Sequence, residues 1–206
     1  YTLNGNKPDK TSVLYNKPFS IQDSKIVTAA IFTKNITNIE YSEKSFVFHK
    51  AMGKKVEYRI MYNEKYSGNG NSTLVDGFKG SKDFSDNSWQ GWKSENLDII
   101  IDLEKNTKIN CITPGFLEDH ASRIFLPEKI IFSFSKNGSN YSKTHEKKIS
   151  PILKRREKDR FEFLIDNINQ LARYVKVQTL GQKVCPKWHS DKGEHCWLFV
   201  DEVIIN

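Results

Sequence analysis

Four tryptophans stand near expected loop–strand junctions, where their ring faces could stack on sugar rings. They are Trp89, Trp92, Trp188 and Trp197. Trp188 is followed by His189 in a polar loop, and a planar polar group beside a tryptophan is typical of carbohydrate sites. Because binding residues concentrate on loops, this pair is the best exposed candidate. Trp197 opens an apolar strand pattern, and we expect it and Trp89 in the core.

A second possible chemistry involves Asp76, which is followed by Gly77 and, further along the chain, by Gly80 and Ser81. A tight glycine-bearing loop can expose backbone carbonyls, and these oxygens together with a carboxylate suit calcium. The same Asp-Gly pair is also an ordinary turn signal. Spacing alone favours the turn.

Catalytic constellations are poorly supported. The sequence has no Gly-x-Ser-x-Gly, no phosphate loop and no His-Glu-x-x-His. Asp201 and Glu202 are adjacent, so on a strand they would face opposite sides rather than flank one glycosidic bond. Asp119-His120 is a single dipeptide in an expected loop. We therefore expect a chain without catalytic activity.

Two of the three cysteines, Cys185 and Cys196, bracket a polar loop. They could form a disulfide in an oxidising compartment or stay as two unpaired thiols. Zinc is a weaker alternative, with His189 and His195 completing a ligand set. Neighbouring strand residues point to opposite faces, and this disfavours joint ligation by His195 and Cys196.

The chain has 206 residues, 37% of them hydrophobic, which suits one large globular domain or two small ones. No apolar run is long enough to span a bilayer. The net charge of +7 is concentrated between Lys143 and Arg160, where eight basic residues meet three acidic ones. A solvated hairpin is the favoured interpretation, and we expect no nucleic-acid partner. A patch for anionic glycan or phospholipid, using Lys154–Arg160, is the alternative.

Short segments rich in β-branched and aromatic residues dominate the chain, and turn signals such as Asn137-Gly138 separate them. Helical patterns are confined to Lys82–Asp86 and Asp166–Leu171, and Tyr62–Ser72 has a linker-like composition. The pattern predicts an all-β sandwich or barrel. The expected strands are Ile26–Phe32, Ser45–Ala51, Lys54–Ile60, Leu97–Leu103, Lys108–Thr113, Lys129–Phe134, Arg160–Ile165, Arg173–Leu180 and Leu198–Ile205.

An ordered series of motifs resembles the discoidin domain, also called the coagulation factor V/VIII type C domain, and is similar to family 32 carbohydrate-binding modules. The resemblance covers residues 56–206. It is carried by Leu74-Val-Asp-Gly77 with Gly80-Ser81, Ser88-Trp-Gln-Gly-Trp92, Leu97–Leu103, Phe125-Leu-Pro127, Ser133-Phe-Ser-Lys-Asn-Gly138, Ala172-Arg-Tyr-Val-Lys-Val177 and Asp201-Glu-Val203.

The preceding part of the chain resembles the chitobiase/hexosaminidase C-terminal domain. Tyr1-Thr-Leu-Asn-Gly-Asn-Lys-Pro8 and Val27-Thr-Ala-Ala30 carry this likeness. The two resemblances together imply a discoidin-type jelly-roll β-sandwich over residues 56–206, preceded by a partial fibronectin-like β-sandwich over residues 1–55. This arrangement is similar to the C-terminal end of bacterial family 20 β-N-acetylhexosaminidases.

The resemblance also implies a structural calcium ion. Carried over residue by residue, its ligands would be the Thr73 and Asp201 carbonyls, the Asp76 and Glu202 carboxylates, and Ser81 through its carbonyl and hydroxyl. For the sugar, Trp188 would stack on a ring face while its polar neighbours bond hydroxyl groups. The expected carbohydrate-binding residues are Gln90, Trp92, Asp119, His120, Trp188 and His189.

The implied function is that of a non-catalytic carbohydrate-binding module of an exported bacterial glycoside hydrolase, in the periplasm, on the outer surface or secreted. Its partners would be an N-acetylhexosamine- or galactose-containing glycan and the hydrolase's catalytic domain. The alternative is a structural accessory domain without a ligand. Gln90 stands where related galactose binders carry His, and their Pro-Arg pair is absent, which favours this alternative.

Overall fold

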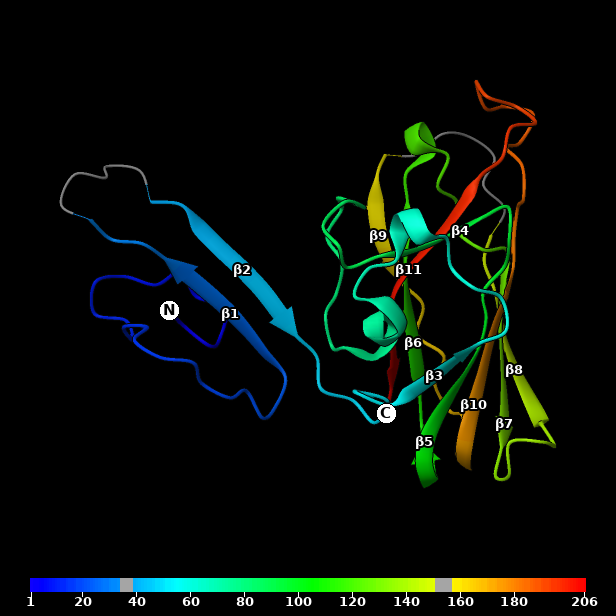
Figure 1. Cartoon of the computed structure of the whole chain (residues 1–206), viewed down its shortest axis with the longest axis horizontal. Helices are drawn as coiled ribbons and strands as arrows, with labels where there is room; N and C mark the ends of the chain where they lie inside the picture. The colour runs from blue at the N-terminus through cyan, green and yellow to red at the C-terminus, as the bar shows by residue number, and fades with distance from the viewer. Residues whose placement is uncertain (34–38, 151–156) are drawn as a thin grey trace.

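The computed structural model describes residues 1–33, 39–150 and 157–206, and Figure 1 shows it as two β units joined in sequence. No helix in these ranges is both long and apolar enough to cross a membrane. The elements are the strands β1 (Lys25–Ala30), β2 (Tyr41–Phe46), β3 (Lys55–Tyr58), β4 (Gln90–Lys93), β5 (Asp98–Ile109), β6 (Ile112–Glu118), β7 (Lys129–Ser135), β8 (Ser142–Lys148), β9 (Asp159–Glu162), β10 (Gln170–Leu180) and β11 (Trp197–Ile205), with the 3₁₀ turns η1 (Glu64–Tyr66), η2 (Gly70–Val75) and η3 (His120–Ser122).

The larger unit is a sandwich of two antiparallel sheets, as the sequence predicts. One sheet has the order β3-β5-β10-β7-β8 and the other β4-β11-β6-β9. Alternating side chains on facing strands meet between the sheets, as pleated geometry requires. Residues at this core, all completely buried, include Ile99, Ile101, Phe116, Phe132, Val175, Val177 and Val200.

The smaller unit at the N-terminus is a two-stranded antiparallel sheet of β1 and β2. Thr2 and Asn4 bridge to Thr28 and Ile26 of β1, which adds a short third segment beside this pair. The chain then enters the sandwich directly after β2. Phe46 bridges to Phe78, and the Val47 N–H donates to the Gly77 carbonyl at 2.9 Å.

Both expected helical segments are absent, for different reasons. In Lys82–Asp86, the Asp83 carboxylate accepts bonds from the Ser85 N–H and hydroxyl, which fixes a turn in place of a helix. In Asp166–Leu171, Ile168 is completely buried and β10 begins at Gln170. The helix-like spacing of apolar residues in this segment arises because Ile168 is buried just before β10 begins.

Several strands differ from the expected ones. β2 lies at Tyr41–Phe46 and not at Ser45–Ala51, β4 at Gln90–Lys93 was not expected, and the expected strand Lys108–Thr113 is divided between the end of β5 and the start of β6. β8 at Ser142–Lys148 is the second strand of the hairpin at Asn137-Gly138, for which no bounds were predicted. β8 is the edge of its sheet and carries lysines, a common feature of edge strands. It forms the first part of the basic segment; residues 154–156 of that segment lie outside the described ranges.

The Arg160–Asp201 ion pair ties β9 to β11, and we expect it to carry much of the fold's stability. Asp201 is completely buried, and Arg160 Nε donates to its Oδ2 at 2.5 Å. Arg160→Ala leaves this carboxylate without its counter-charge, which should cost about 3 kcal/mol of unfolding free energy in urea titrations.

The matched control is Arg173→Ala, which breaks an ion pair with Asp102 on the exposed side of the other sheet. Solvent screens such a pair, so this variant should unfold close to the wild-type midpoint. Equal losses of unfolding free energy in the two variants would show that the buried ion pair contributes no more to stability than the exposed one.

Candidate functional site

The turn at Asp76 packs directly against Glu202 of β11. Gly77 has a φ of +81°, a conformation suited to glycine, and its N–H donates to Glu202 Oε2 at 2.8 Å. The pairing of β11 with β6 shifts register between Val200 and Val203, which leaves Glu202 outside the ladder. The carboxyl groups of Asp76 and Glu202 are close enough to influence each other's pKa.

Burial dominates the electrostatics of this junction. It raises the pKa of Glu202 to about 9, with the neighbouring Asp76 charge acting in the same direction. Burial also raises the pKa of Asp76. On the other side, His49 Nε2 lies 3.0 Å from Glu202 Oε1, and burial lowers the pKa of His49 to about 4. The acidic pair therefore sits in a site that disfavours two negative charges.

The side chains of the other expected calcium ligands, Asp201, Thr73 and Ser81, each have hydrogen-bond partners within the protein. The Asp201 carboxylate is turned toward Arg160 and the Gly80 N–H, while its residue shares the unpaired stretch of β11 with Glu202. The Thr73 hydroxyl donates to the Gly70 carbonyl at 2.9 Å. Ser81 is exposed, its carbonyl accepts from Trp89 Nε1, and its hydroxyl oxygen accepts from the Asp83 N–H.

These oxygens match calcium chemistry in part. Two carboxyl groups brought together are a suitable start for a cage of hard oxygen ligands. The carbonyl and hydroxyl oxygens of Ser81 each accept one hydrogen bond and keep a second lone pair. Among the described residues, no group of three or more His, Cys, Asp or Glu side chains is arranged to hold a metal.

Three of the expected sugar contacts are completely or almost completely buried, so their placement needs correction. Gln90 donates to the Gly70 carbonyl and accepts from the Tyr58 hydroxyl, both at 2.8 Å. Trp92 donates its indole N–H to the Ile60 carbonyl and packs in the core. His120 is also completely buried. These side chains hold loops together and present no surface to a ligand.

The remaining expected contacts gather into one aromatic cluster with His120. His189 is buried, with Nε2 lying 2.7 Å from the His120 carbonyl oxygen. The Asp119 carboxylate caps η3 by accepting from the Ser122 hydroxyl at 2.8 Å. Trp188 packs on His120 at 5.1 Å between ring centroids and keeps part of its surface exposed. This cluster anchors the 185–196 loop and leaves Trp188 as its exposed member.

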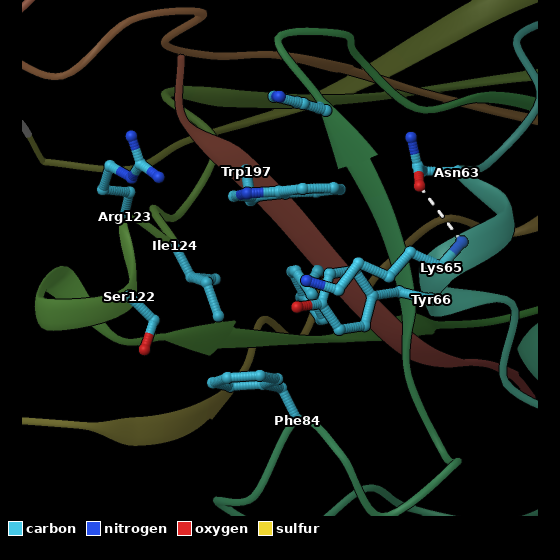
Figure 2. Close-up of a pocket in the computed structure, with 10 residues that line it drawn as sticks. Asn63, Lys65, Tyr66, Phe84, Ser122, Arg123, Ile124 and Trp197 are labelled. Carbon is cyan, nitrogen blue, oxygen red and sulfur yellow. Dashed lines mark hydrogen bonds between the residues drawn. The ribbon is translucent and has the colours of Figure 1, made fainter. Parts of the chain in front are cut away.

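A pocket of about 370 Å³ lies elsewhere, on the outer face of the β4-β11-β6 sheet (Figure 2). Leu198 and Val200 of β11 point into the main core, so the alternation of the strand turns Trp197 and Phe199 to the opposite face. The pocket is lined by Asn63, Lys65, Tyr66, Phe84, Lys93, Ser122, Arg123, Ile124, Trp197 and Phe199.

Aromatic rings set at steep angles shape this pocket. Tyr66 meets Trp197 at 5.1 Å and Phe84 at 5.7 Å between centroids, at 88° in both contacts. Phe199 closes the base behind Tyr66 at 4.8 Å. In Figure 2, Trp197 and Phe84 lie edge-on on opposite sides of Tyr66. The result is a partly exposed slot with flat aromatic surfaces and polar groups at its edge.

Sequence reasoning missed this pocket because its lining comes from separate segments. Tyr66 belongs to η1, Phe84 to the turn after η2, Lys93 to β4 and Arg123 to the end of η3. None of them forms a local motif. The expectation that Trp197 lies in the main core was wrong: it is half-buried on the outer face, because alternation along β11 turns it away from the inward Leu198.

The cysteines Cys185 and Cys196 are free thiols, and both are buried. Burial raises the pKa of Cys196 to about 12, with Cys185 as a further cause, and its sulfur lies 3.0 Å from the Gln182 carbonyl oxygen. The zinc alternative finds no support among the described residues. His195 contacts Ser94, whereas His189 contacts His120, so the two imidazoles serve different partners.

Comparison with solved structures identifies the sandwich as the discoidin type of fold. A Streptococcus pneumoniae fucose binding module, SpX-3, matches with a TM-score of 0.53 at 15% identity, over 78% of this chain and 98% of that one. A mutant of the lectin binding domain of Lectinolysin, complexed with Lewis b, matches with a TM-score of 0.50 at 17% identity, over 77% of this chain and 95% of that one.

Further comparisons concern the two parts of the chain separately. CBM32-1 from a family 31 glycoside hydrolase of Clostridium perfringens aligns with a TM-score of 0.48 at 16% identity, covering 74% of this chain and 93% of its own. The family model described as Fn3 associated matches residues 1–46. The comparison with curated protein sequences finds no match.

The burial of the two loop thiols has a direct chemical consequence. Cys185 and Cys196 are buried and have a raised pKa, so they should react slowly with a chromogenic disulfide reagent at pH 8, while the partly exposed Cys111 reacts first. In urea all three thiols should react. Fewer than three reactive thiols in urea without reductant would instead indicate that the loop pair is oxidised.

Proposed function

We propose that this chain is a non-catalytic carbohydrate-binding module whose site is the pocket beside Trp197. The observation that carries the proposal is the set of partly exposed aromatic rings on a discoidin-type sandwich. The nonpolar face of a pyranose ring would stack on Trp197 or Tyr66. Its hydroxyl groups would then reach Asn63 and Ser122 at the edge.

The pocket is small and partly open, which suits recognition of one or two sugar units. Contacts on this scale support weak binding, with Kd roughly in the millimolar range. A weak module is still useful when tethered to an enzyme, because attachment to a polymeric glycan raises the local concentration of the catalytic domain.

The parent protein is part of this proposal. The motif series and the N-terminal likeness support a C-terminal position in an exported bacterial family 20 β-N-acetylhexosaminidase, in the periplasm, on the outer surface or secreted. The Fn3-associated match over residues 1–46 is compatible with this context. The ligand would then come from an N-acetylhexosamine- or galactose-containing glycan, and the catalytic domain would be the covalent partner.

Calcium is proposed as a structural ion. The carboxyl groups of Asp76 and Glu202 would hold it together with the carbonyls of Thr73 and Asp201 and with Ser81 through its carbonyl and hydroxyl. A bound cation would supply the positive charge that two buried carboxylates need. The chain's own residues would then fix the Asp76 turn against β11.

A purely structural accessory role is the second candidate, and one surface favours it. In the N-terminal unit Val13, Leu14 and Tyr15 are exposed at 60%, 83% and 61%. A run of exposed apolar side chains is a common sign of a contact surface. The catalytic domain of the parent enzyme would cover it.

Sugar binding is tested by replacing the pocket tryptophan. Trp197→Ala should abolish binding of the chain to a glycan array, because it removes the stacking surface. Trp188→Ala is the matched control, since it removes a tryptophan from the other loop cluster, and it should bind as wild type. Circular dichroism melting confirms that both variants fold.

Loss of binding in the Trp188 variant alone would move the site to the 185–196 loop. Absence of glycan binding by the wild-type chain would leave the structural role as the better conclusion.

Calcium binding is tested by thermal melting with added Ca²⁺ or chelator. A ligand at a hundred times its Kd stabilises the folded state by about 2.7 kcal/mol, so Tm should rise with Ca²⁺. Glu202→Gln should remove this rise. Asp83→Asn, which changes an exposed carboxylate in the same loop region, should keep it. An unchanged wild-type Tm at millimolar Ca²⁺ would refute the proposed ion.

A further inference from the structure

The charged groups around the Trp197 pocket are all of one sign. Its lining includes Lys65, Lys93 and Arg123, and none of its ten residues is acidic. Neutral sugar sites commonly use carboxylates or amides to accept hydrogen bonds from hydroxyl groups. In this lining the charged side chains can only donate, so the pocket is better matched to a ligand that carries negative charge.

Trp197 stands between two of these cations in the sheet. Lys93 is its register partner on β4, with Nζ 5.9 Å from the centre of the Trp197 ring. The backbone N–H of Trp197 donates to the backbone carbonyl of Arg123 at 2.8 Å. The Lys93 ammonium group lies over the Trp197 ring and the Arg123 guanidinium lines the same pocket, so a sugar stacked on Trp197 would meet both cations.

The third cation lies over the neighbouring ring. Lys65 Nζ is 5.1 Å from the centre of Tyr66, the ring that meets Trp197 at a right angle. Figure 2 shows Arg123 on one side of Trp197 and the Lys65 chain on the other. Three positive groups thus surround one aromatic slot.

Existing partners neutralise these cations only weakly. Arg123 Nε lies 3.8 Å from Asp191 Oδ2, longer than a hydrogen bond, and both side chains are more than a third exposed. The ion pairs within the described ranges use neither Lys65 nor Lys93. Lys158 stands over Phe84 at 4.9 Å and lies 3.5 Å from Asp119, so that nearby carboxylate already has a cation.

We propose that this pocket selects an acidic saccharide, with a pyranose ring stacked on Trp197 and its carboxylate or sulfate group held by Arg123 and Lys93. This inference rests on the proposed carbohydrate-binding function and names the class of sugar. The planar guanidinium of Arg123 suits bidentate contact with either group. The chain's net charge of +7 adds a long-range attraction for such glycans.

The test uses isothermal titration of the full chain with four probes. Galacturonate oligosaccharides and sulfated galacto-oligosaccharides are the two acidic arms, and galacto-oligosaccharides and N-acetylglucosamine oligosaccharides are the neutral arms. At least one acidic probe should bind, and raising NaCl from 50 to 500 mM should weaken it several-fold. Which acidic arm binds identifies the anionic group.

Charge variants locate the binding. Arg123→Gln and Lys93→Gln should each reduce affinity for the acidic probe about tenfold, since a hydrogen bond to a charged group is lost. Lys187→Gln is the control, because it removes an exposed cation outside the pocket lining. It should leave affinity unchanged. Melting curves establish that the variants are folded.

The possible failures separate this inference from the proposed function. Salt-independent binding of a neutral probe that needs Trp197 would overturn the acidic selectivity and leave the carbohydrate-binding proposal standing. Salt-sensitive binding that is unchanged in both pocket variants would place the acidic ligand on another basic surface and overturn the inference. No binding to any of the four probes or to a wider array would refute both.

Discussion

The buried acidic stretch of β11 is the constraint on which the rest of the structure depends. Asp201 and Glu202 are both completely buried, where an uncompensated carboxylate is costly. Their partners come from far along the chain: the Gly77 and Gly80 N–H groups and the Arg160 guanidinium. A side chain at Gly115 would collide with Asp201 and Arg160, so even β6 is fitted to this pair. The 76–80 turn, β6 and β9 are therefore positioned by one short segment.

The same strand also forms one side of the pocket that we propose as the ligand site. On the N-terminal side of Asp201 and Glu202, the side chains of β11 alternate between the two faces of the sheet. Leu198 and Val200 fill the main core, while Trp197 and Phe199 form a second cluster on the outer face. The turn that leads from Asp76 toward β4 carries Phe84 across that outer face. Fixing the turn at Glu202 thus also sets one wall of the pocket, which links two completely buried carboxyl groups to the half-buried rings of Tyr66, Phe84 and Trp197.

Sequence alone was enough for the framework and for the meeting of Asp76 with Glu202. Long apolar strands such as β5 and β10 have a clear signal, and the family resemblance supplied the long-range pair that spacing could not. The sequence alone could not predict that Gln90 and His120 are buried. The residue type does not reveal whether a polar side chain bonds a buried carbonyl or faces solvent. The sequence was also insufficient for the pocket, since Tyr66, Phe84 and Arg123 meet only through tertiary structure.

The pocket's exposed charged side chains can change without disturbing the fold. The outer cluster is separated from the main core by the β11 backbone, so changes at the exposed Lys65 or Lys93 leave the buried layers untouched. Arg123 is different, because it ends η3 in a left-handed conformation (φ +61°) and its carbonyl pairs with Trp197. Its backbone is part of the scaffold while its guanidinium lines the pocket. If the pocket binds a sugar as proposed, substitutions at the two lysines would change its specificity, while the backbone bond between Arg123 and Trp197 would keep the scaffold in place.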